Sequence, residues 1–507
     1  MSILELVPIV SCNRRRLDQG WEVDFMVNDN NHSRLLFCAI SDLHLGEEDS
    51  VLTNLELGEP VLNPRGPNRC MTTLVNLLHS IKRELNDGKP IPRLVLLGDV
   101  VELAQAPFHL ATSFFRTLLF LLSQRKLADR VVYCPGNHDH GLWSLARNSA
   151  WLEGLCSPSD LEARNDFNYT TQISRPARIP VLERLGKLFP EYEHDIDMLV
   201  AYPNYRLVAG SNHEFIFTHG HFMEDSYKLM SIVARRLMEN VPTKKLSTAP
   251  RKTVEELEKD NAAWIDFVWS GIASSGQSGA LFERIYEAVM VRDREVAALL
   301  DRVSVVLKEE YDIPYVIEAF EDSAFKAVLK KILGEMGVIG SHHRASARAG
   351  AFTRSLESEL KAYITNYISR QLASEGDRPS IDKTVFIHGH THKPYFQAIE
   401  AGDFKSVAAV NTGGWVVESK NVTKADPRRP GVVIGTDHGD VALLTFNKGH
   451  ELVFECKGTN DIWCALIRER LDTLALELGR SVVASSRIRE KHLEQRMKKL
   501  EHKLDEL

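Results

Sequence analysis

The sequence predicts an α/β fold with a large helical insertion and a charged helix at its C-terminus. Up to about residue 140, apolar strand-like runs alternate with helix-like runs, the pattern of parallel βαβ units. Polar motifs rich in histidine and aspartate directly follow several of these apolar runs. Between residues 225 and 382 strand-like runs nearly vanish and helical periodicity dominates. These three observations together predict a sheet covered by helices, with a helical segment inserted between the earlier and the later strands of the chain.

The composition is that of an ordinary globular protein. The chain has 507 residues, of which 44% are hydrophobic and 26% charged, enough for two or three domains. A net charge of −7 counts against a broad nucleic-acid-binding surface, although a local basic groove is compatible with it. The seven cysteines form no CxxC pair, which indicates a reduced, intracellular protein. No apolar run reaches the roughly 18 residues of a membrane span, and no secretory signal pattern is present, so we expect a cytoplasmic protein.

The elements of the first part follow from apolar periodicity and turn residues. Strands are expected at 21–27, 34–40, 93–97, 130–134, 197–201, 205–209 and 214–217, and helices at 71–86 and 111–125. In parallel sheets, ligands bind at the carboxyl ends of the strands. The polar motifs after residues 40, 97 and 134 lie at such ends.

The second part of the chain is first predominantly helical and then rich in strands. Helices are expected at 229–240, 254–270, 281–309, 324–336 and 354–373, and strands at 384–387, 406–410, 432–435, 441–446 and 451–454. We therefore divide the chain into a core in two parts, 1–224 and 383–460, an insertion at 225–382 that forms a cap, substrate or interaction domain, and a helical tail at 461–507. In this tail, leucine and methionine recur at coiled-coil spacing, at Leu493, Met497, Leu500, Leu504 and Leu507. This seam either docks on its own chain or dimerises, and we favour a homo-oligomer contact through it or through the insertion.

Five polar motifs, each after an apolar run, carry the candidate chemistry. They are Asp42-x-His44, Gly98-Asp99, Gly136-Asn137-His138-Asp139, His219-Gly-His221 and Gly389-His390-Thr-His392. Alone, each has an ordinary structural explanation, such as a turn capped by Asp42 or a polar loop at 388–392. Carboxylates and imidazoles that leave successive strands are also typical metal ligands. Their order and repeated position favour a shared metal site.

The five motifs resemble the signature of the calcineurin-like metallophosphoesterases, which is DxH, GDxxE, GNHD, GH and GHxH. The resemblance covers about residues 35–220 and 383–446. It implies a four-layer α-β-β-α metallophosphoesterase sandwich and a metal-dependent phosphoric ester hydrolase. Such an enzyme hydrolyses a phosphate mono-, di- or pyrophosphoester by attack of a hydroxide that bridges two metals.

Within this superfamily, the motifs are nearer to the bacterial branch that includes UDP-2,3-diacylglucosamine pyrophosphohydrolases than to protein Ser/Thr phosphatases. The chain has GDVVEL and GNHD where those phosphatases carry GDxVDRG and GNHE. In the lipid-precursor enzymes a GNRD-type third motif is common and the helical lid is small. The chain has His138 and a much larger insertion, so their substrate is not transferred to it.

The resemblance implies seven ligands for two divalent metal ions. Asp42, His44 and His392 would hold one ion. Asn137, His219 and His390 would hold the other, and Asp99 would bridge both. Nitrogen and oxygen ligands without thiolates suit Mn, Fe or Zn, and we favour Mn.

The resemblance makes His138 the proton donor to the leaving group or a stabiliser of the transition state, with Glu102 orienting it. The alternative for Glu102 is a surface residue early in the next helix. His221 and His140 are candidate substrate contacts, and either competes for the ligand position of the GH motif. A loop at 340–350 carries His342, His343, Arg344 and Arg348, which either clamp a phosphate or form a solvated connection.

The expected substrate is a phosphorylated small molecule or a nucleotide-like compound. One alternative is a nuclease of the same fold, which needs a basic groove that the acidic net charge disfavours. Another is a scaffold protein that has kept the fold without catalysis. Such a protein should have lost ligands, whereas all seven ligand positions are filled here.

Overall fold

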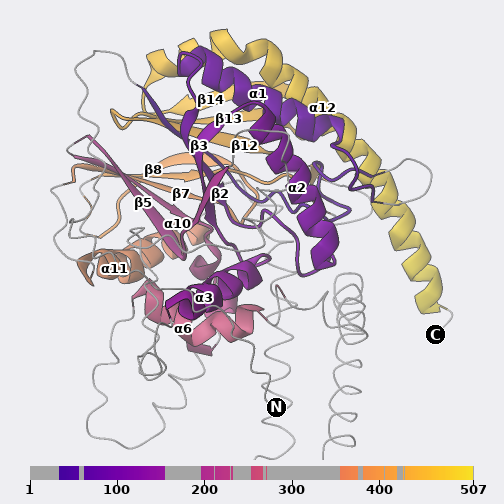
Figure 1. The fold of residues 1–507 in the computed structure, drawn as a ribbon, viewed down its shortest axis with the longest axis horizontal. Coiled ribbons are helices and arrows are strands. Elements are labelled where there is room, and N and C mark those ends of the chain that lie inside the picture. The colour runs from indigo at the N-terminus through magenta and orange to yellow at the C-terminus, as the bar shows by residue number, and fades with distance from the viewer. Residues whose placement is uncertain are drawn as a thin grey trace, which may run out of the picture.

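We describe the protein from a computed structural model (Figure 1). The described residues are 34–55, 62–154, 196–231 except 211 and 229, 253–270 except 267–269, 354–374, and 381–505 except 403, 405, 419–425 and 428.

A seven-stranded mixed sheet carries the N-terminal strands and the last strands of the chain. Its strands are β1 (Leu35–Ile40), β2 (Ile91–Leu97), β3 (Ala128–Cys134), β4 (Asp197–Val200), β12 (Gly431–Thr436), β13 (Val441–Lys448) and β14 (Glu451–Gly458), in the order β14-β13-β12-β1-β2-β3-β4. Neighbours from β1 to β4 pair in parallel, and those from β1 through β12 to β14 pair antiparallel. Strands far apart in sequence thus lie side by side at the centre of the sheet.

A second sheet has five strands. They are β5 (Asn204–Ala209), β6 (His213–Thr218), β7 (Lys383–His388), β8 (Tyr395–Ile399) and β9 (Val407–Asn411), in the order β5-β6-β7-β9-β8. The three central strands, β6, β7 and β9, are parallel to their neighbours in this group. Two two-residue strands, β10 (Val417–Glu418) and β11 (Asp426–Pro427), pair separately.

The two sheets pack face to face and helices cover their outer faces. Phe37 of β1 lies between Phe215 and Phe217 of β6, with ring centroids 4.8 and 4.9 Å apart. On the outside of the large sheet lie α1 (Arg69–Leu85), which Asn68 caps, and α2 (Phe108–Gln124) (Figure 1). On the other side, α10 (Arg354–Tyr363), a π-helical turn (Ile364–Ile368) and α11 (Ser369–Ser374) follow one another, and Tyr363 contacts Phe386 of β7. The predicted α-β-β-α sandwich is confirmed.

Two further helices flank the end of the sandwich where the motifs lie. They are α3 (His140–Gly154) and α6 (Val254–Ile265), whose first turn is closed by a reciprocal capping box between Thr253 and Glu256. Short 3-10 turns at His221–Met223 and Asp225–Lys228 follow β6.

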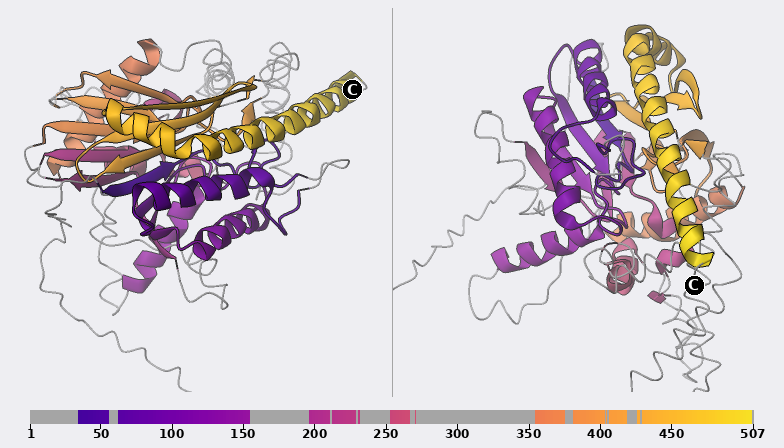
Figure 2. Two further views of the ribbon diagram at one scale, coloured as in Figure 1. Left: turned by 90° about the horizontal axis from the view of Figure 1, so that it is seen from above. Right: turned by 90° about the vertical axis from the view of Figure 1, so that its right-hand side faces the viewer.

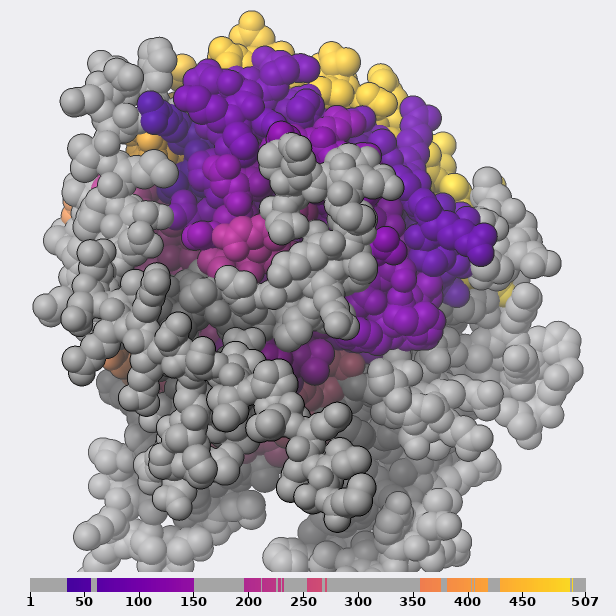
Figure 3. All heavy atoms as spheres, in the orientation of Figure 1, coloured from indigo at the N-terminus to yellow at the C-terminus, as the bar shows by residue number. Residues whose placement is uncertain are grey.

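The C-terminal helix α12 (Asp461–Asp505) runs along α1 and the outer edge of the large sheet, and its end extends beyond the body (Figure 2). It borders the surface formed by α1 and α2 (Figure 3). A buried stripe at helical spacing packs it onto its own chain, through Cys464, Ile467, Leu471, Ala475, Leu478 and Val482. The side chains of the predicted seam at Leu493–Leu507 lie outside the described residues, so the oligomer contact stays a prediction.

Most of the expected core strands and helices form within one or two residues of their predicted bounds. The expected strand at 21–27 and the helices at 281–309 and 324–336 lie outside the described residues, as does nearly all of the helix expected at 229–240. In the part of the chain that the structure describes, no helix has the length and apolar character needed to cross a bilayer.

Candidate active site

The five motifs converge because each leaves the carboxyl end of a parallel strand. Asp42 and His44 follow β1, Asp99 follows β2 and Asn137 follows β3. From the second sheet, His219 follows β6, and His390 and His392 follow β7. All seven side chains are buried. The predicted ligands therefore lie together, where the two sheets present the ends of their central strands.

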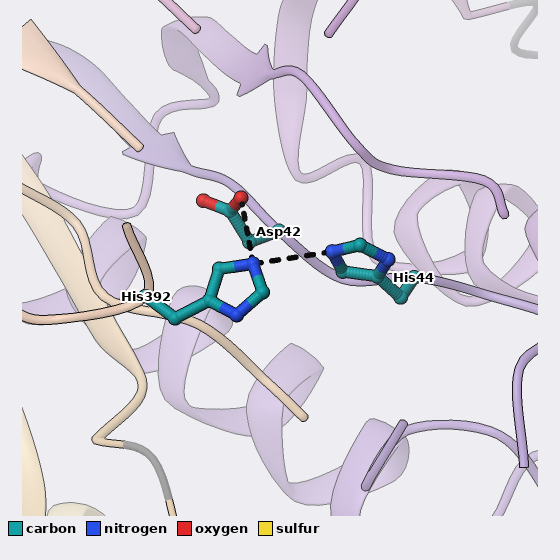
Figure 4. A group of neighbouring side chains, drawn as sticks. All are labelled: Asp42, His44 and His392. Atoms are coloured by element: carbon teal, nitrogen blue, oxygen red, sulfur yellow. Dashed lines mark hydrogen bonds and ion pairs between the residues drawn. The ribbon is translucent and has the colours of Figure 1, made fainter. Parts of the chain in front are cut away.

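A first group of donors consists of Asp42, His44 and His392 (Figure 4). His392 Nε2 lies 3.2 Å from Asp42 Oδ1 and 3.3 Å from His44 Nε2. Two imidazole nitrogens and a carboxylate oxygen thus point at a common position, the arrangement that a shared cation requires.

A second group consists of Asp99, His219 and His390. His219 Nε2 lies 3.0 Å from Asp99 Oδ2 and 3.1 Å from Asn137 Oδ1. The other ring nitrogen of His219, Nδ1, lies 3.1 Å from the Leu97 carbonyl oxygen, and this contact fixes the ring orientation.

Asp99 lies between the two groups. Its Oδ2 atom is 3.0 Å from His219 Nε2 in one group and 3.9 Å from His44 Nε2 in the other. Its Oδ1 atom accepts a hydrogen bond from the His138 backbone N–H at 2.8 Å. This is the position expected for a carboxylate shared by two metal ions.

The backbone at this site is strained. Five non-glycine residues of the two groups have left-handed backbone angles, with φ of 53° at Asp42, 45° at His44, 49° at Asp99, 69° at His390 and 56° at His392. Each such residue costs on the order of 1–3 kcal/mol, and strain of this kind clusters at functional sites. The convergent donors and the strain together fit a metal centre.

Main-chain hydrogen bonds hold these strained loops together. The Asp42 N–H donates to the Gly98 carbonyl at 3.0 Å, and the His44 N–H donates to the Asp99 carbonyl at 2.9 Å. The His390 N–H donates to the Asp42 carboxylate at 3.0 Å. The loops of the first, second and fifth motifs thus position one another.

Two glycines of the motifs are required sterically. Gly98 has φ 81°, and a Cβ atom there would overlap the His219 ring. A Cβ atom at Gly389 would overlap the Asp42 carboxylate. Glycine thus lets the backbone approach the donor groups closely.

Glu102 joins His138 to the first donor group. It is completely buried, and its Oε2 atom lies 2.8 Å from His138 Nδ1 and 2.9 Å from His44 Nδ1. Its Oε1 atom accepts hydrogen bonds from the backbone N–H groups of Ala104 and Gln105 at 2.7 and 2.9 Å. The surface alternative for Glu102 is therefore wrong. The contact with His44 was not foreseen.

The pKa values of three buried groups at the site, those of His138, Asp99 and Asp42, are set by their oppositely charged neighbours together more than by burial. Burial alone would lower the pKa of His138, but Glu102 and Asp99 outweigh it and raise this pKa to about 10. Burial would raise the pKa of Asp99, but His219 and His138 hold it well below its usual value. The pKa of Asp42 is lowered in the same way, chiefly by His392 against the effect of burial. Both carboxylates are therefore ionised at neutral pH, as metal ligands must be.

Asp139, the last residue of the third motif, ties two loops together. Its carboxylate accepts hydrogen bonds from the Val100 N–H at 2.8 Å, the Gly136 N–H at 2.5 Å and the Tyr133 hydroxyl at 2.5 Å. The loops after β2 and β3 are thereby fixed relative to each other.

The expected substrate contacts fare differently. Both ring nitrogens of His140 lie 2.6 Å from carboxylates, Nε2 from Glu258 and Nδ1 from Asp266. Both nitrogens of His140 are thus occupied by carboxylates, and its role as a substrate contact stays a prediction. His221 is buried beside His219 and lies 3.2 Å from the Tyr202 hydroxyl. The loop with His342, His343, Arg344 and Arg348 lies outside the described residues.

Two carboxylates at the site were missed by the sequence reasoning. Glu224 Oε1 lies 3.2 Å from His390 Nε2, and Glu47 Oε2 lies 3.4 Å from His44 Nδ1. Each stands three residues after a motif histidine, Glu224 after His221 and Glu47 after His44. An acidic residue three positions after a motif histidine is the sequence signal that could have indicated these contacts.

Residues around the fifth motif support its backbone. The Asn411 side-chain amide donates to the Gly389 carbonyl at 2.7 Å and to Thr391 Oγ1 at 3.1 Å. His388 Nε2 bonds the Tyr395 hydroxyl and belongs to neither donor group. His388 and Asn411 thus support the backbone of the fifth motif.

Comparison with known proteins identifies the family. A family model described as calcineurin-like phosphoesterase matches residues 35–302, more than half of the chain. A crystal structure of a dimetal phosphatase from Danio rerio is 12% identical and covers 85% of this chain and 99% of its own, with a TM-score of 0.30. No curated protein matches the sequence. The chain belongs to the calcineurin-like phosphoesterase family and is a metal-dependent phosphoesterase.

Proposed function

We propose that this phosphoesterase uses two divalent metal ions to hydrolyse a phosphate mono-, di- or pyrophosphoester. The observation that carries the proposal is Asp99, whose Oδ2 atom lies within 4 Å of a histidine nitrogen from each donor group. Asp42, His44 and His392 would hold one ion. Asn137, His219 and His390 would hold the other.

Bound there, the ions would activate a water molecule for attack on phosphorus and offset the charge on the phosphoryl oxygens. The donor set contains imidazole, carboxylate and amide groups and no thiolate, which suits Mn, Fe or Zn. We favour Mn.

His138 is proposed to donate the proton to the leaving group. Glu102 holds the ring by its Nδ1 atom. The Nε2 atom is thereby the one left to transfer a proton.

The substrate is proposed to be a phosphorylated small molecule or a nucleotide-like compound, selected by a cap formed from residues 225–382. The described part of this segment supports the assignment. Helix α6 contacts the core beside the site through Glu258, and the Ser270 hydroxyl donates to the Asn137 carbonyl at 2.8 Å. The division into a two-part core, this cap and the tail at 461–507 follows the same reasoning.

The proposal is tested with protein stripped of metal by a chelator and reloaded separately with Mn²⁺, Fe²⁺, Zn²⁺ or Mg²⁺. Hydrolysis of aryl phosphate monoesters, aryl phosphate diesters and a nucleotide pyrophosphate is then measured for each form. We expect metal-dependent hydrolysis of at least one class, with Mn²⁺ most effective. If calorimetry shows that metal binds, but no metal-loaded form hydrolyses any of the three substrate classes, the proposal is wrong.

Asp99→Asn is the matching variant. The amide keeps the shape and the hydrogen bond from His138 but removes the charge that both donor groups share. We expect loss of metal from both positions, measured by elemental analysis, and loss of nearly all hydrolysis. Asp129→Asn, at an exposed position at the start of β3, serves as the control. Two retained ions in Asp99→Asn would contradict the bridging role.

A further inference from the structure

The C-terminal helix carries a buried cation. Arg489 of α12 is only 2% exposed, although arginine side chains are rarely buried to this extent. Helix α12 also lies beyond residues 35–302, the range matched by the family model. The place of this side chain therefore needs its own explanation.

The guanidinium of Arg489 bonds the loop that follows the first motif. Nε donates to the Ser50 carbonyl at 2.5 Å, and Nη2 donates to the Thr53 carbonyl. Nη1 donates to Ser485 Oγ at 2.6 Å, and this hydroxyl in turn donates to the Val51 carbonyl at 2.9 Å. The planar fork of arginine suits such a set of fixed acceptors.

The same loop supports the segment that carries Asp42 and His44. Ser50 Oγ donates to the carbonyl of Leu43, the residue between these two, at 2.6 Å. The Gly46 N–H donates to Thr53 Oγ1 at 3.2 Å. Each of the two residues whose carbonyl binds Arg489 thus also bonds the 43–46 segment through its side chain.

The segment needs such support because it is strained. Asp42 and His44 have φ of 53° and 45°, angles that persist only where the surroundings enforce them. A loop held from outside by a buried guanidinium is one such constraint.

We infer that Arg489 is a positioning residue for the candidate metal centre and acts through Ser50 and Thr53 on the segment 42–46, which carries Asp42 and His44. The C-terminal helix thereby helps to position the ligands of the site. This inference rests on the proposed metal-binding function.

The test measures the binding of Mn²⁺ to the chelator-stripped full chain by calorimetry. In Arg489→Met we expect one of two binding events to weaken by about tenfold, the lower end of the usual range for residues that support metal ligands. The matched control is Arg487→Met, an exposed arginine on the same helix, which should leave both binding events unchanged.

Ser50→Ala keeps Arg489 and its carbonyl partners but removes the bond to Leu43. It should weaken the same binding event, and the double variant should be no weaker than Arg489→Met alone, because both act along one path. If Arg489→Met does not fold, Ser50→Ala carries the test.

The outcomes separate the two proposals. If the unaltered protein binds no divalent metal, both fail. If it binds two ions and Ser50→Ala and the folded Arg489→Met bind them equally well, only the inference fails. Lower stability of Arg489→Met against urea, with unchanged metal affinity, would show a merely structural role and also overturn it.

Discussion

At the scale of single residues, His138 and Glu102 have different proposed roles at the site. The His138 ring centroid lies 4.9 Å from that of His44, and the His138 backbone N–H donates to Asp99, while the His138 Nδ1 atom faces Glu102. Glu102 contacts two histidines with one oxygen, one proposed to bind metal and one proposed to transfer a proton. Removing each in turn should therefore give different results.

His138→Ala should retain both metal ions and lower kcat by ~10²–10⁴-fold, the usual contribution of a general acid. The reason is that only the proton donor is removed, while His44 keeps its bond to Glu102. Metal content and kcat are measured together on an aryl diester. A variant that loses its metal would show that His138 is itself a ligand.

Glu102→Gln should weaken metal binding by ~10–100-fold, as is typical when a carboxylate behind a histidine ligand is lost. It should also lower kcat, because His138 loses the charge that keeps it protonated. Calorimetry and steady-state kinetics test the two effects. Glu84→Gln, at the end of α1, is the control. Unchanged metal affinity would remove Glu102 from the support of His44.

At the scale of elements, His140 fastens helix α6 to the core. Its imidazole lies between Glu258 and Asp266, Ser144 bonds Asp266 at 2.6 Å, and the Tyr202 hydroxyl donates to Glu258 at 2.8 Å. Burial would lower the pKa of His140, but the two carboxylates raise it from 6.5 to about 10.

His140→Ala should therefore destabilise the protein by about 3–5 kcal/mol near pH 6, because Glu258 stays buried without its partner. The folded-state pKa of His140 exceeds the unfolded value, so its stabilisation is complete below about pH 6.5 and disappears as the pH rises toward 10. Urea denaturation across this range should show a pH-dependent loss in the unaltered protein that is reduced in His140→Ala. The exposed His109→Ala is the control. Equal urea midpoints for His140→Ala and the unaltered protein near pH 6 would contradict the link.

The positions of the site residues were predictable because strand ends carry a local signal. Apolar runs before Asp42, Asp99 and Asn137 mark strands, and parallel pairing brings their ends together. The same reasoning placed His219 and His390. Glu102 was expected beside His138 from the motif alone, and the structure adds its second contact with His44.

Other features depend on distant contacts that no local pattern records. The approach of Glu224 to His390 joins residues 166 positions apart, and Arg489 meets Ser50 across 439 positions. The carboxylate partners of His140 could not be predicted, because they come from α6 and the residue that follows it, far along the chain. Strand β8 was missed because its middle residues are exposed and its apolar alternation is weak.

At the scale of the whole molecule, metal binding should stabilise the fold, because the donors come from both sheets and do not converge in an unfolded chain. With Mn²⁺ at 100 times its dissociation constant, we expect about 2.7 kcal/mol for each independent site. Urea denaturation with and without Mn²⁺ measures this shift for the unaltered protein, and Asp99→Asn should show little of it. An unchanged midpoint at saturating metal would contradict the location of the site between the sheets.

The place of β1 has a consequence for how the protein is made. This strand, at residues 35–40, pairs with β12 at residues 431–436, so one of its two neighbours emerges from the ribosome 391 residues later. At 5–20 residues per second, that delay is roughly 20–80 s. During this time the nascent chain must keep the unpaired backbone edge of β1 from pairing with another strand. Residues 225–382, the proposed cap, are also synthesised before His390 and His392, so the proposed metal centre can assemble only after this segment has been made.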